Sequence, residues 1–564
     1  MTNYLFSIEN PQQQYIRIQV TFEVTQKVTI VRIPAWRPGR YELGNFAKNV
    51  KGFKVVNENG NLLSFTKTTK DSWEVDTDGV SKILVDYFYY AAELNAGSSF
   101  LSSEQLYVNP VNCCVYTDES ASQPLSVTLD IPDAWTIASS MKLDDKTMFA
   151  SSFDELADAP FLCSPTLQYR TYTVATTLFH IWFQGECKPD WNKMIPDFEA
   201  FTKKQIEKFN EFPTDEYHFI FQILPFKAYH GVEHCKSTVI LLGPSYEVFG
   251  SLYKELLGIS SHELYHTWNV KAIRPIEMYP YDFQKENYSR MGYLCEGVTT
   301  YMGDLFLLKS GVFSLDQYLV ELVTQFQKHF DNFGRFNYSV GDSSFDTWLD
   351  GYVPGAPGRK VSIYTEGCLL AFVTDVLVWK GSGYKYSLDR VMKNLYFNYA
   401  LKGKGVSETD YKNELRNFIG DYVDELFDNY FHGTHSLASI LTEALDLLGL
   451  ELIDKPNASY SAGRLGFKYL QKVVSIYPGS PADMAMLTIN DEIIAVNSCL
   501  VNNDLDKWLT YFDDDLKILT VLRSGKLLEI QLPEVQRSFY NEYQIVGIEK
   551  PDHQQIKALR DWIS

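Results

Sequence analysis

Apolar and polar residues alternate with a period of two through the first third of the chain, which is typical of half-buried β-strands. The runs Tyr15–Phe22 and Val28–Ile33 follow this alternation and are rich in β-branched residues. Turn-forming sequences, such as Arg37-Pro-Gly39 and Asn57-Glu-Asn-Gly60, separate these runs. The pattern predicts an N-terminal antiparallel β-domain over residues 1–168.

Near Asp190 the period of the apolar positions lengthens to that of an α-helix. Apolar residues recur at helical spacing between Pro196 and Asn210, and helical patterns then dominate to about residue 450. One strand-like run, Tyr217–Leu224, lies among them. We therefore predict a mainly helical domain over residues 169–452.

Short strand patterns return after the turn-rich segment Lys455–Gly463. They predict a small β-domain over residues 453–545, followed by a C-terminal tail at residues 546–564. The fold class expected for the whole chain is multidomain α+β. The candidate strands of the small domain are 472–476, 492–496, 516–522 and 527–532.

Composition and charge narrow the class of protein. The 564 residues are too many for one hydrophobic core, and 45% hydrophobic with 22% charged residues is an ordinary globular composition. A formal net charge of -20 argues against a surface that binds duplex nucleic acid. The longest apolar candidate, Cys368–Trp379, is interrupted by Asp375 and is shorter than the roughly 18 residues that span a bilayer. We expect a buried helix there, no membrane span and no nucleic-acid partner.

Cysteine use and the N-terminus bear on the compartment. The 8 cysteines are scattered and form no C-x-x-C pair, so they do not predict a disulfide framework. The first residues lack the basic and apolar regions of a signal peptide. We expect a cytoplasmic protein, although a chain whose signal peptide had been removed would begin in the same way.

One motif carries most of the candidate chemistry. The segment Ser261-His-Glu-Leu-Tyr-His266 contains H-E-x-x-H, and Tyr253–Ser261 before it is compatible with a helix. On a helix, His262 and His266 lie on one face, so both reach a single Zn²⁺. Glu263 then lies beside the metal, placed to take a proton from water. The motif predicts a zinc site with Glu263 as its general base.

A catalytic zinc site needs a third protein ligand and one open position. A metzincin would place a histidine ten residues after His262, but Ala272 stands there. The alternative is a glutamate from a second helix, and two are available. Glu286 lies in a polar, loop-like stretch, whereas Glu296 begins an apolar, helix-like run. The spacing alone leaves both open.

The run His262–Pro275 resembles the signature of the glycyl aminopeptidase family of zinc peptidases. That family belongs to the gluzincins, so the resemblance implies a thermolysin-like fold for the helical domain. Ala35–Tyr41 and Phe46–Val50 are similar to parts of the family's N-terminal β-domain. Leu294–Tyr301 is similar to the E-G-x-T-x-Y segment that supplies the third ligand, which implies Glu296 and one Zn²⁺ per chain.

The resemblance also implies a substrate anchor. Tyr229–His234 is similar to the family's G-G-x-E-H strand, with His230 in place of the first glycine. In related aminopeptidases the glutamate of such an edge strand binds the free α-amine of the peptide, a charge-assisted hydrogen bond. This implies substrate-binding roles for Glu233 and the neighbouring Gly231, while His234 is expected to be a packed histidine.

A further resemblance implies an oxyanion donor. Ile363–Gly367 is similar to the Y-x-K-G segment of gluzincin aminopeptidases, with Glu366 in place of the lysine. In that segment the tyrosine hydroxyl hydrogen-bonds the transition-state oxyanion, so Tyr364 takes this role. Three other residues match the family signature without an assignable role, namely Asn269, Lys271 and Arg274.

The small C-terminal domain resembles a PDZ domain. Arg464–Phe467 is similar to a carboxylate-binding loop, and Tyr477–Ala482 with Asn490–Asn497 is similar to the bacterial pattern P-G-S-P-A followed by G-D-x-I. Asn490 replaces the usual glycine. A PDZ groove adds a peptide as an extra strand and holds its terminal carboxylate through backbone N–H groups. The resemblance implies peptide-binding roles for Leu465, Gly466 and Phe467; the alternative is a β-domain that only packs on the catalytic body.

The expected function is therefore that of a zinc aminopeptidase acting on peptides by metal-activated water. The family preference implies removal of small N-terminal residues, glycine and to a lesser degree alanine. Two alternatives stay open: an endopeptidase with the same zinc site, in which Glu233 is not an amine anchor, and a catalytically idle scaffold that binds peptides through its PDZ-like module. The intact motif argues against the scaffold, because an idle protein has no need of Glu263.

Overall fold

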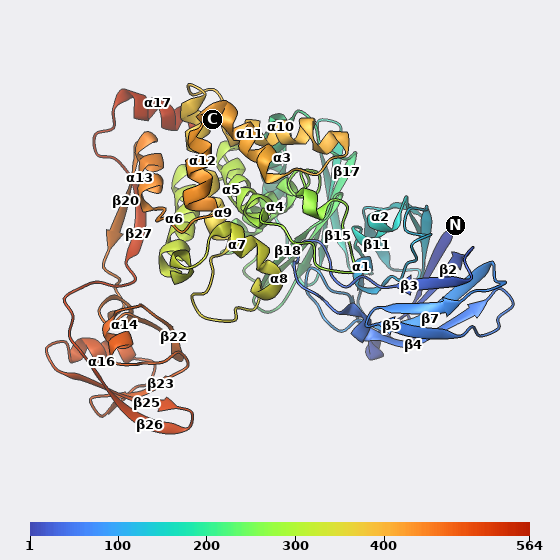
Figure 1. Cartoon of the computed structure of the whole chain (residues 1–564), viewed down its shortest axis with the longest axis horizontal. Helices are drawn as coiled ribbons and strands as arrows, with labels where there is room; N and C mark the ends of the chain where they lie inside the picture. The colour runs from blue at the N-terminus through green and yellow to red at the C-terminus, as the bar shows by residue number, and fades with distance from the viewer. The chain divides into compact units, whose positions relative to one another are not determined.

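The computed structural model describes residues 1–564, which form two compact units. The first contains Met1–Tyr318, Gly334–Leu437 and Asp561–Ser564, and the second contains Leu319–Phe333 and Ala438–Arg560. Figure 1 traces the chain through both. The architecture is the multidomain α+β fold that the sequence predicts, whereas the domain boundaries given above remain predictions.

The N-terminal part of the chain folds into three sheets (Figure 1). Seven strands lie in the order β12-β13-β10-β1-β2-β7-β4, and two smaller sheets have the orders β3-β6-β5 and β11-β14-β9-β8. Neighbouring strands are antiparallel except β1 and β10, a parallel pair that departs from the antiparallel domain predicted above. The strands are β1 (Thr2–Ser7), β2 (Tyr15–Glu23), β3 (Val28–Arg32), β4 (Val50–Asn57), β5 (Phe65–Thr69), β6 (Ser72–Asp76), β7 (Lys82–Tyr90), β8 (Phe100–Leu101), β9 (Leu106–Val108), β10 (Leu125–Asp130), β11 (Thr136–Ser139), β12 (Lys142–Asp144), β13 (Thr147–Ala150) and β14 (Phe161–Ser164). Short helices join them: η1 (Pro11–Gln13), η2 (Phe46–Asn49), α1 (Pro110–Cys113) and α2 (Phe153–Ala157).

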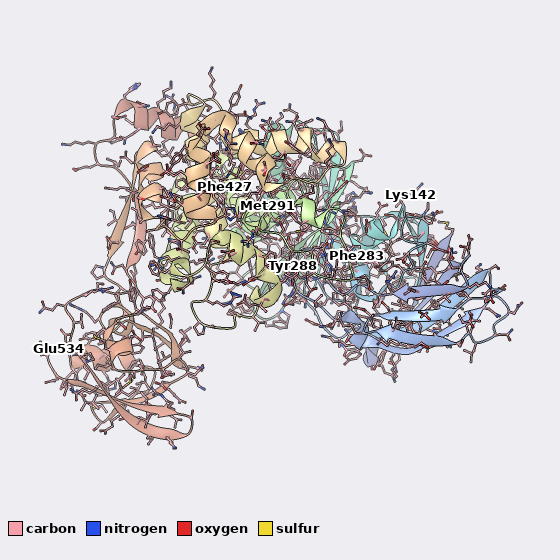
Figure 2. The ribbon with its side chains drawn as sticks, viewed as in Figure 1. Lys142, Phe283, Tyr288, Met291, Phe427 and Glu534 are labelled. Atoms are coloured by element: carbon pink, nitrogen blue, oxygen red, sulfur yellow. The ribbon has the colours of Figure 1, made fainter.

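Alternation along β2 shows how this domain builds its core. Every second residue of the strand, from Ile16 to Phe22, is fully buried, and the residues between them are partly exposed. The same core receives Phe283, a residue of the following domain that is labelled in Figure 2. The backbone reinforces the contact, since Ala35 N–H donates to Phe283 O at 2.7 Å. Packing and hydrogen bonding thus join the two domains of the first unit.

The catalytic part begins with a five-stranded sheet in the order β15-β16-β17-β19-β18. Its three inner strands run parallel, and the outer two are antiparallel to their neighbours. Because β18 pairs only with β19, its other side is a free edge, and Glu233 is its last residue. The strands are β15 (Gln168–Val174), β16 (Thr177–Gln184), β17 (Glu216–Ile223), β18 (Ala228–Glu233) and β19 (Ser237–Gly243).

Helices make up most of the rest of this domain, as the sequence predicts. The predicted helix over residues 196–210 is α3, and the apolar run at residues 368–379 lies inside the buried helix α9. The helices are α3 (Trp191–Phe209), α4 (Tyr253–Tyr265), α5 (Val298–Lys309), α6 (Leu315–Asp331), α7 (Val340–Phe345), α8 (Thr347–Asp350), α9 (Ile363–Gly381), α10 (Leu388–Asn398), α11 (Glu408–Ile419) and α12 (Tyr422–Leu426). Two π-helices, η4 (Tyr293–Gly297) and η7 (Phe427–Phe431), and three 3-10 helices, η3 (Ile276–Met278), η5 (Phe333–Phe336) and η6 (Ala400–Lys402), complete the set. None of the helices is both long and apolar enough to cross a bilayer.

The second unit contains the small β-domain. It has a four-stranded sheet, β24-β23-β25-β26, and two two-stranded pairs, β20-β27 and β21-β22, around an apolar core. Four of its strands, β22, β23, β25 and β26, coincide with the predicted ones within a residue. The elements are α13 (Ala438–Leu447), β20 (Leu450–Lys455), α14 (Tyr460–Gly463), β21 (Phe467–Leu470), β22 (Lys472–Ile476), α15 (Pro481–Met484), β23 (Glu492–Val496), β24 (Cys499–Leu500), α16 (Leu505–Tyr511), β25 (Lys517–Arg523), β26 (Lys526–Leu532), β27 (Glu542–Gly547) and α17 (His553–Trp562).

The end of the chain, predicted only as a tail, packs into the first unit. Trp562 is 1% exposed, and its Nε1–H donates to Asp375 Oδ2 at 2.7 Å. The same carboxylate accepts hydrogen bonds from the Tyr301 hydroxyl at 2.6 Å and from Leu388 N–H at 2.6 Å. Asp375 interrupts the apolar face of α9, and these three donors satisfy its buried oxygens.

We expect Trp562→Ala to lower the free energy of unfolding of the first unit by about 3–5 kcal/mol, because it leaves a cavity and removes one donor from Asp375. Trp562→Phe keeps most of the ring volume and should lose less. Urea unfolding followed by circular dichroism measures both. Equal stability of wild type and Trp562→Ala would show that this ring does not support the fold.

Candidate metal centre

The H-E-x-x-H motif lies at the C-terminal end of α4, where this helix packs closely against α5. Ser261 Oγ–H donates to Gly303 O at 2.7 Å. A Cβ atom at residue 303 would lie 3.0 Å from the His262 backbone, so a side chain there would push the helices apart. The glycine on α5 therefore fixes the position of the motif.

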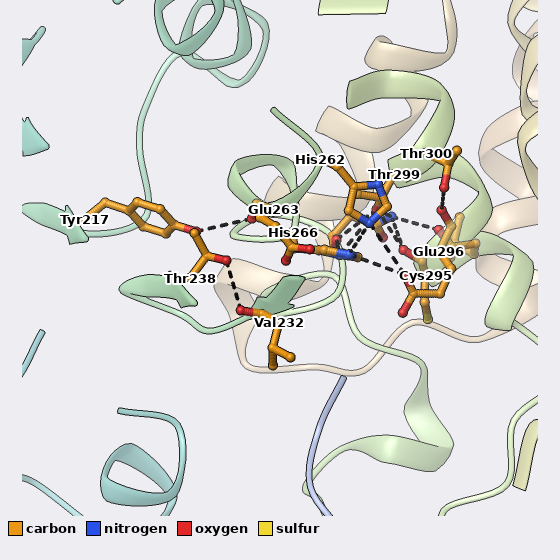
Figure 3. A network of polar contacts seen from close by, with 12 residues as sticks. Tyr217, Val232, Thr238, His262, Glu263, His266, Cys295, Glu296, Thr299 and Thr300 are labelled. Atoms are coloured by element: carbon orange, nitrogen blue, oxygen red, sulfur yellow. Dashed lines mark hydrogen bonds and ion pairs between the residues drawn. The ribbon is translucent and has the colours of Figure 1, made fainter. Parts of the chain in front are cut away.

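Two histidines and one glutamate converge at this point (Figure 3). The Nε2 atoms of His262 and His266 lie 3.0 Å apart, and Glu296 Oε2 lies 3.8 Å and 3.4 Å from them. His266 and Glu296 are buried, whereas the His262 side chain is 19% exposed. Two imidazoles and a carboxylate, open on one side, are the donor set of a catalytic metal site. The structure brings Glu296 to the histidines and leaves Glu286 outside every such group.

Asn269, which the sequence left without a role, orients one of the ligands. Its carbonyl oxygen lies 2.7 Å from His266 Nδ1, so the ring donates through Nδ1 and keeps the Nε2 lone pair for a metal. Its side-chain amide donates to Leu294 O at 2.8 Å and to Thr299 Oγ1 at 3.1 Å. Asn269 thus ties the ring of His266 to the segment that carries Glu296.

Glu296 projects from the π-helix η4, an element that often marks a functional site. The segment packs directly on α9, because a Cβ at Gly297 would collide with the backbone of Gly367. A larger residue at either glycine would move η4 away. The two glycines therefore determine how far the third carboxylate reaches toward the histidines.

Three glutamates surround the histidines in the interior. Ligand atoms of Glu233, Glu263 and His266 lie within 4.8 Å of one another, and Glu296 is close by. Burial raises the pKa of Glu263 well above its usual range, and although His266 opposes the shift, the charges of Glu233 and Glu296 add to it. Glu233 Oε1 and Glu263 Oε2 have no hydrogen-bond partner. Buried, unpaired carboxylates are costly without a nearby cation, so the chemistry of the donor set fits a divalent metal.

Of the two histidines, only His266 lies in an environment that favours its protonated, positively charged form. Burial alone would lower the pKa of His266, but the charge and hydrogen bond of Glu296 outweigh it and raise the pKa to about 9. His262 lacks such a partner, and burial lowers its pKa. A metal ion supplies the same compensation to both rings, because metal ligation takes the place of a proton.

Glu263, the predicted base, lies against the strand that carries Glu233, the predicted anchor. A Cβ atom at Gly231 would collide with Glu263 Oε1, so the backbone of β18 lies directly against the Glu263 carboxylate. Tyr364, in the first turn of α9, faces the same group of charges: burial raises its pKa, and Glu296, Glu233 and Glu263 all add to the shift. The two histidines, the three glutamates and Gly231 thus lie close together, and their roles in catalysis stay predictions.

A buried ion pair holds the end of β18. Lys271 Nζ lies 2.7 Å from Asp158 Oδ1, and His234 Nδ1 lies 3.1 Å from the same oxygen. Cys235 N–H donates to the other oxygen at 2.8 Å. Burial alone would raise the pKa of Asp158, but Lys271 and His234 outweigh it and hold the pKa well below its usual range. His234 is therefore a packed histidine, and Lys271 positions the strand that carries Glu233.

Arg274 braces the same region. Its guanidinium lies 3.9 Å from the centre of the Tyr281 ring, and one nitrogen donates to Lys271 O at 3.2 Å. A cation over an aromatic face is a stabilising contact in a partly dry environment. The side chain thus packs behind β18 rather than at the donor set of the metal centre.

A turn of the N-terminal domain borders the site. The sequence predicts this turn but not its contact with the site. Arg37–Arg40 forms a tight turn in which Gly39 has φ +79°. A Cβ at Gly39 would lie 2.5 Å from Glu233 Oε2, so its backbone lies against the predicted anchor. Pro-Gly at the centre of a turn signals such a conformation, but nothing in the sequence signals what the turn touches.

The predicted PDZ-like loop lies in the second unit. Gly466 has φ +74°, and Phe467 begins β21. Leu465 N–H donates to Tyr460 O at 3.3 Å, and Gly466 N–H donates to Ala462 O at 3.2 Å. Two of the three predicted donors thus already bond to the preceding helix α14, and peptide binding by this loop stays a prediction.

The donor set and the unpaired base define a metal-dependent hydrolase, and comparison with known proteins gives its family. The family model described as Peptidase M61 N-terminal domain matches residues 3–165, and the model described as M61 glycyl aminopeptidase matches residues 255–370. The chain belongs to the M61 glycyl aminopeptidase family and is a metallopeptidase whose substrates are peptides. No curated protein matches it.

One solved structure shares the fold over the whole chain. An aminopeptidase N family protein from Idiomarina loihiensis superposes with a TM-score of 0.92 at 24% identity, covering 100% of each chain. An M1 zinc metallopeptidase from Deinococcus radiodurans gives a TM-score of 0.48 at 12% identity, covering 77% of this chain and 94% of that one. The first of these shows the architecture over the whole length.

We expect Glu296→Ala to lower metal affinity by more than about tenfold, because a catalytic site of this class needs all three protein ligands. Glu286→Ala, the matched control, should keep its metal. Elemental analysis after dialysis against a weak chelator gives metal per chain for both. Retention by Glu296→Ala together with loss from Glu286→Ala would show that the wrong glutamate is assigned.

Proposed function

We propose that the protein is a zinc aminopeptidase, with one Zn²⁺ per chain, that removes glycine and alanine from the N-terminus of peptides. The observation that carries this proposal is the position of Glu233, a 4% exposed carboxylate with an unpaired oxygen beside Glu263 and His266. A free α-ammonium would supply the cation that this carboxylate lacks, through charge-assisted hydrogen bonds. The interior of a peptide chain carries no such charge.

Zinc fits the donors better than harder metals do. Two neutral imidazoles from His262 and His266 with one carboxylate from Glu296 match zinc chemistry, whereas magnesium and calcium prefer oxygen ligands. When bound, zinc would supply Lewis acidity, which polarises a carbonyl group and makes water more acidic. These three residues would hold the ion, and the remaining residues would act on the substrate.

Glu263 would move the proton. Its Oε1 lies against the Gly231 backbone, and its Oε2 has no partner within the chain. The free oxygen is placed to accept a proton from water and to deliver it to the leaving amine. Burial and the neighbouring carboxylates raise the pKa of Glu263, which favours a group that both takes and returns a proton.

Tyr364 would stabilise the developing charge. It lies in the first turn of α9, near enough for the charges of Glu296, Glu233 and Glu263 to act on its hydroxyl group. Burial and those carboxylates raise its pKa, so the hydroxyl stays protonated and keeps its hydrogen for donation. A donor held near the scissile carbonyl would bind its oxygen more strongly as negative charge develops there.

The first rival is an endopeptidase, which shares the three metal ligands and Glu263 but makes no use of Glu233. The burial of Glu233 favours the aminopeptidase, because a buried carboxylate with an unpaired oxygen suits a free ammonium and not the uncharged interior of a peptide chain. The second rival, an idle scaffold, has no use for the unpaired oxygen of Glu263.

We expect Glu263→Gln to keep its zinc and its fold while losing at least about 10²-fold in kcat, the usual contribution of a general base. The amide keeps the shape of the side chain but has no oxygen basic enough to take a proton. Hydrolysis of a glycyl amide, with zinc content measured on the same sample, tests this. Near-normal kcat with zinc bound would remove Glu263 from the mechanism.

The amine anchor is tested by comparing a glycyl peptide with its N-acetyl form. Acetylation removes the ammonium and leaves the buried Glu233 without a partner, so wild type should prefer the free amine by more than about 10²-fold in kcat/KM. Glu233→Ala should lose most of this preference by slowing the free-amine substrate, with zinc content unchanged.

The outcomes of this comparison separate the rivals. Equal cleavage of both peptides by wild type would favour the endopeptidase. Discrimination that survives in Glu233→Ala would leave the activity in place and assign the anchor to another residue.

A further inference from the structure

Arg37 is a buried cation that forms no ion pair within the chain. The side chain is 5% exposed, and its one hydrogen bond within the chain runs from Nη1 to the carbonyl oxygen of Pro38, at 3.2 Å. The next arginine in the same turn, Arg40, forms an ion pair with Glu42 and lies 4.5 Å from the centre of the Tyr352 ring. Burying a charge costs several kcal/mol unless it is paired, so Arg37 lacks the partner that Arg40 has.

The fold shapes a support for this guanidinium. A Cβ atom at Gly97 would collide with Arg37 Cζ, so the planar group lies flat on the glycine backbone. Asn112 Nδ2–H donates to Gly97 O at 2.8 Å and holds that backbone in place. One face of the guanidinium is therefore covered by the glycine backbone, and within the chain its N–H donors make only the hydrogen bond to Pro38 O.

Arg37 lines a cavity. This cavity has a volume of about 580 Å³ and is lined by polar residues of the N-terminal domain, among them Asn95, Ser98 and Asn112. Glu42 and Glu93 also line it, but the first pairs with Arg40 and the second accepts a hydrogen bond from Asn95 at 2.6 Å. The cavity thus offers space for a ligand, and neither carboxylate in its lining forms an ion pair with Arg37.

The turn that carries Arg37 runs along the path expected for a substrate. Gly39 touches Glu233, the proposed amine anchor, and Gly231 touches the base Glu263, which marks the scissile bond. The part of the peptide beyond that bond would continue along the free edge of β18 toward His230. Ala96 N–H donates to His230 Nδ1 at 3.2 Å, and the next residue, Gly97, supports Arg37. Arg37 therefore lies on the leaving-group side.

We infer that Arg37 binds the C-terminal carboxylate of short peptide substrates, which makes the enzyme a peptidase for di- and tripeptides. A guanidinium with free edges matches a carboxylate through two parallel hydrogen bonds. Three residues of extended strand, the separation of His230 from Glu233, span about 10 Å, which is close to the distance from amine to carboxylate in a tripeptide. The inference rests on the proposed aminopeptidase function and names its substrate class.

One other role for Arg37 makes a different prediction. Its charge also acts on Glu233 and Glu263, and burial lowers its own pKa while Glu233 raises it. An arginine that only kept Glu233 ionised would affect every substrate with a free amine equally. An arginine that binds the substrate carboxylate affects only substrates that have one.

The test compares Gly-Ala, Gly-Ala-Ala and Gly-Ala-Ala-Ala, each as the free acid and as the C-terminal amide. In wild type, kcat/KM should favour the acid by about tenfold or more, which corresponds to 1.4 kcal/mol, and most strongly for the tripeptide. Arg37→Gln should abolish this preference by slowing the acids at least about tenfold more than the amides. Arg40→Gln is the matched control, since it removes a paired guanidinium from the same turn, and it should keep the preference.

Measuring substrate affinity in a protein that does not cleave the peptide tests the role of Arg37 separately from the proposed function. In the Glu263→Gln background, calorimetry should give a lower Kd for Gly-Ala-Ala than for its amide, and Arg37→Gln should equalise the two. Equal Kd values in the Arg37-containing protein would overturn the inference, as would Arg37→Gln slowing acids and amides alike. Failure of wild type to cleave any of the six peptides, acids and amides alike, would instead overturn the aminopeptidase function and leave the binding result to decide the role of Arg37.

Discussion

Negative charge buried beside two histidines is the constraint on which the rest of this structure depends. Glu233, Glu263 and Glu296 lie close together in the interior, and two of them keep an oxygen without a hydrogen-bond partner. Carboxylates so placed repel one another and lose their hydration, so the site is stable only with cations nearby. A metal ion at the histidines and, in the proposed function, an ammonium at Glu233 would supply that compensation, which would connect folding, metal binding and substrate choice.

Close backbone approaches hold this charge in place. Gly303 lets α5 approach the motif helix, Gly297 lets η4 pack on α9, and Gly39 lets a turn of the N-terminal domain reach Glu233. A side chain at any of the three would push an element away from the centre. Asp158 adds an ionic support behind β18 by pairing with Lys271. The site is therefore built from segments far apart in the chain, each held by contacts that leave little room for movement.

The N-terminal domain contributes more than a scaffold. Its core takes in Phe283 from the catalytic domain, and its Arg37–Arg40 turn borders the edge strand that would bind the peptide. With the proposed function, one domain would hold the metal, and the other would limit the space beyond the scissile bond. Chemistry and substrate length would then be set by different domains of the first unit.

The sequence alone determined those features that depend only on residues close together in the chain. The helical spacing of His262 and His266, the position of Glu263 between them and the alternation of the strands all follow from local periodicity. Tertiary structure decided the rest. The choice of Glu296 over Glu286, the enclosure of Glu233 by Gly39 and the unpaired state of Arg37 depend on which distant segments pack together. Burial turns these ordinary charged residues into a site, and burial is a property of the folded chain that no short stretch of sequence carries.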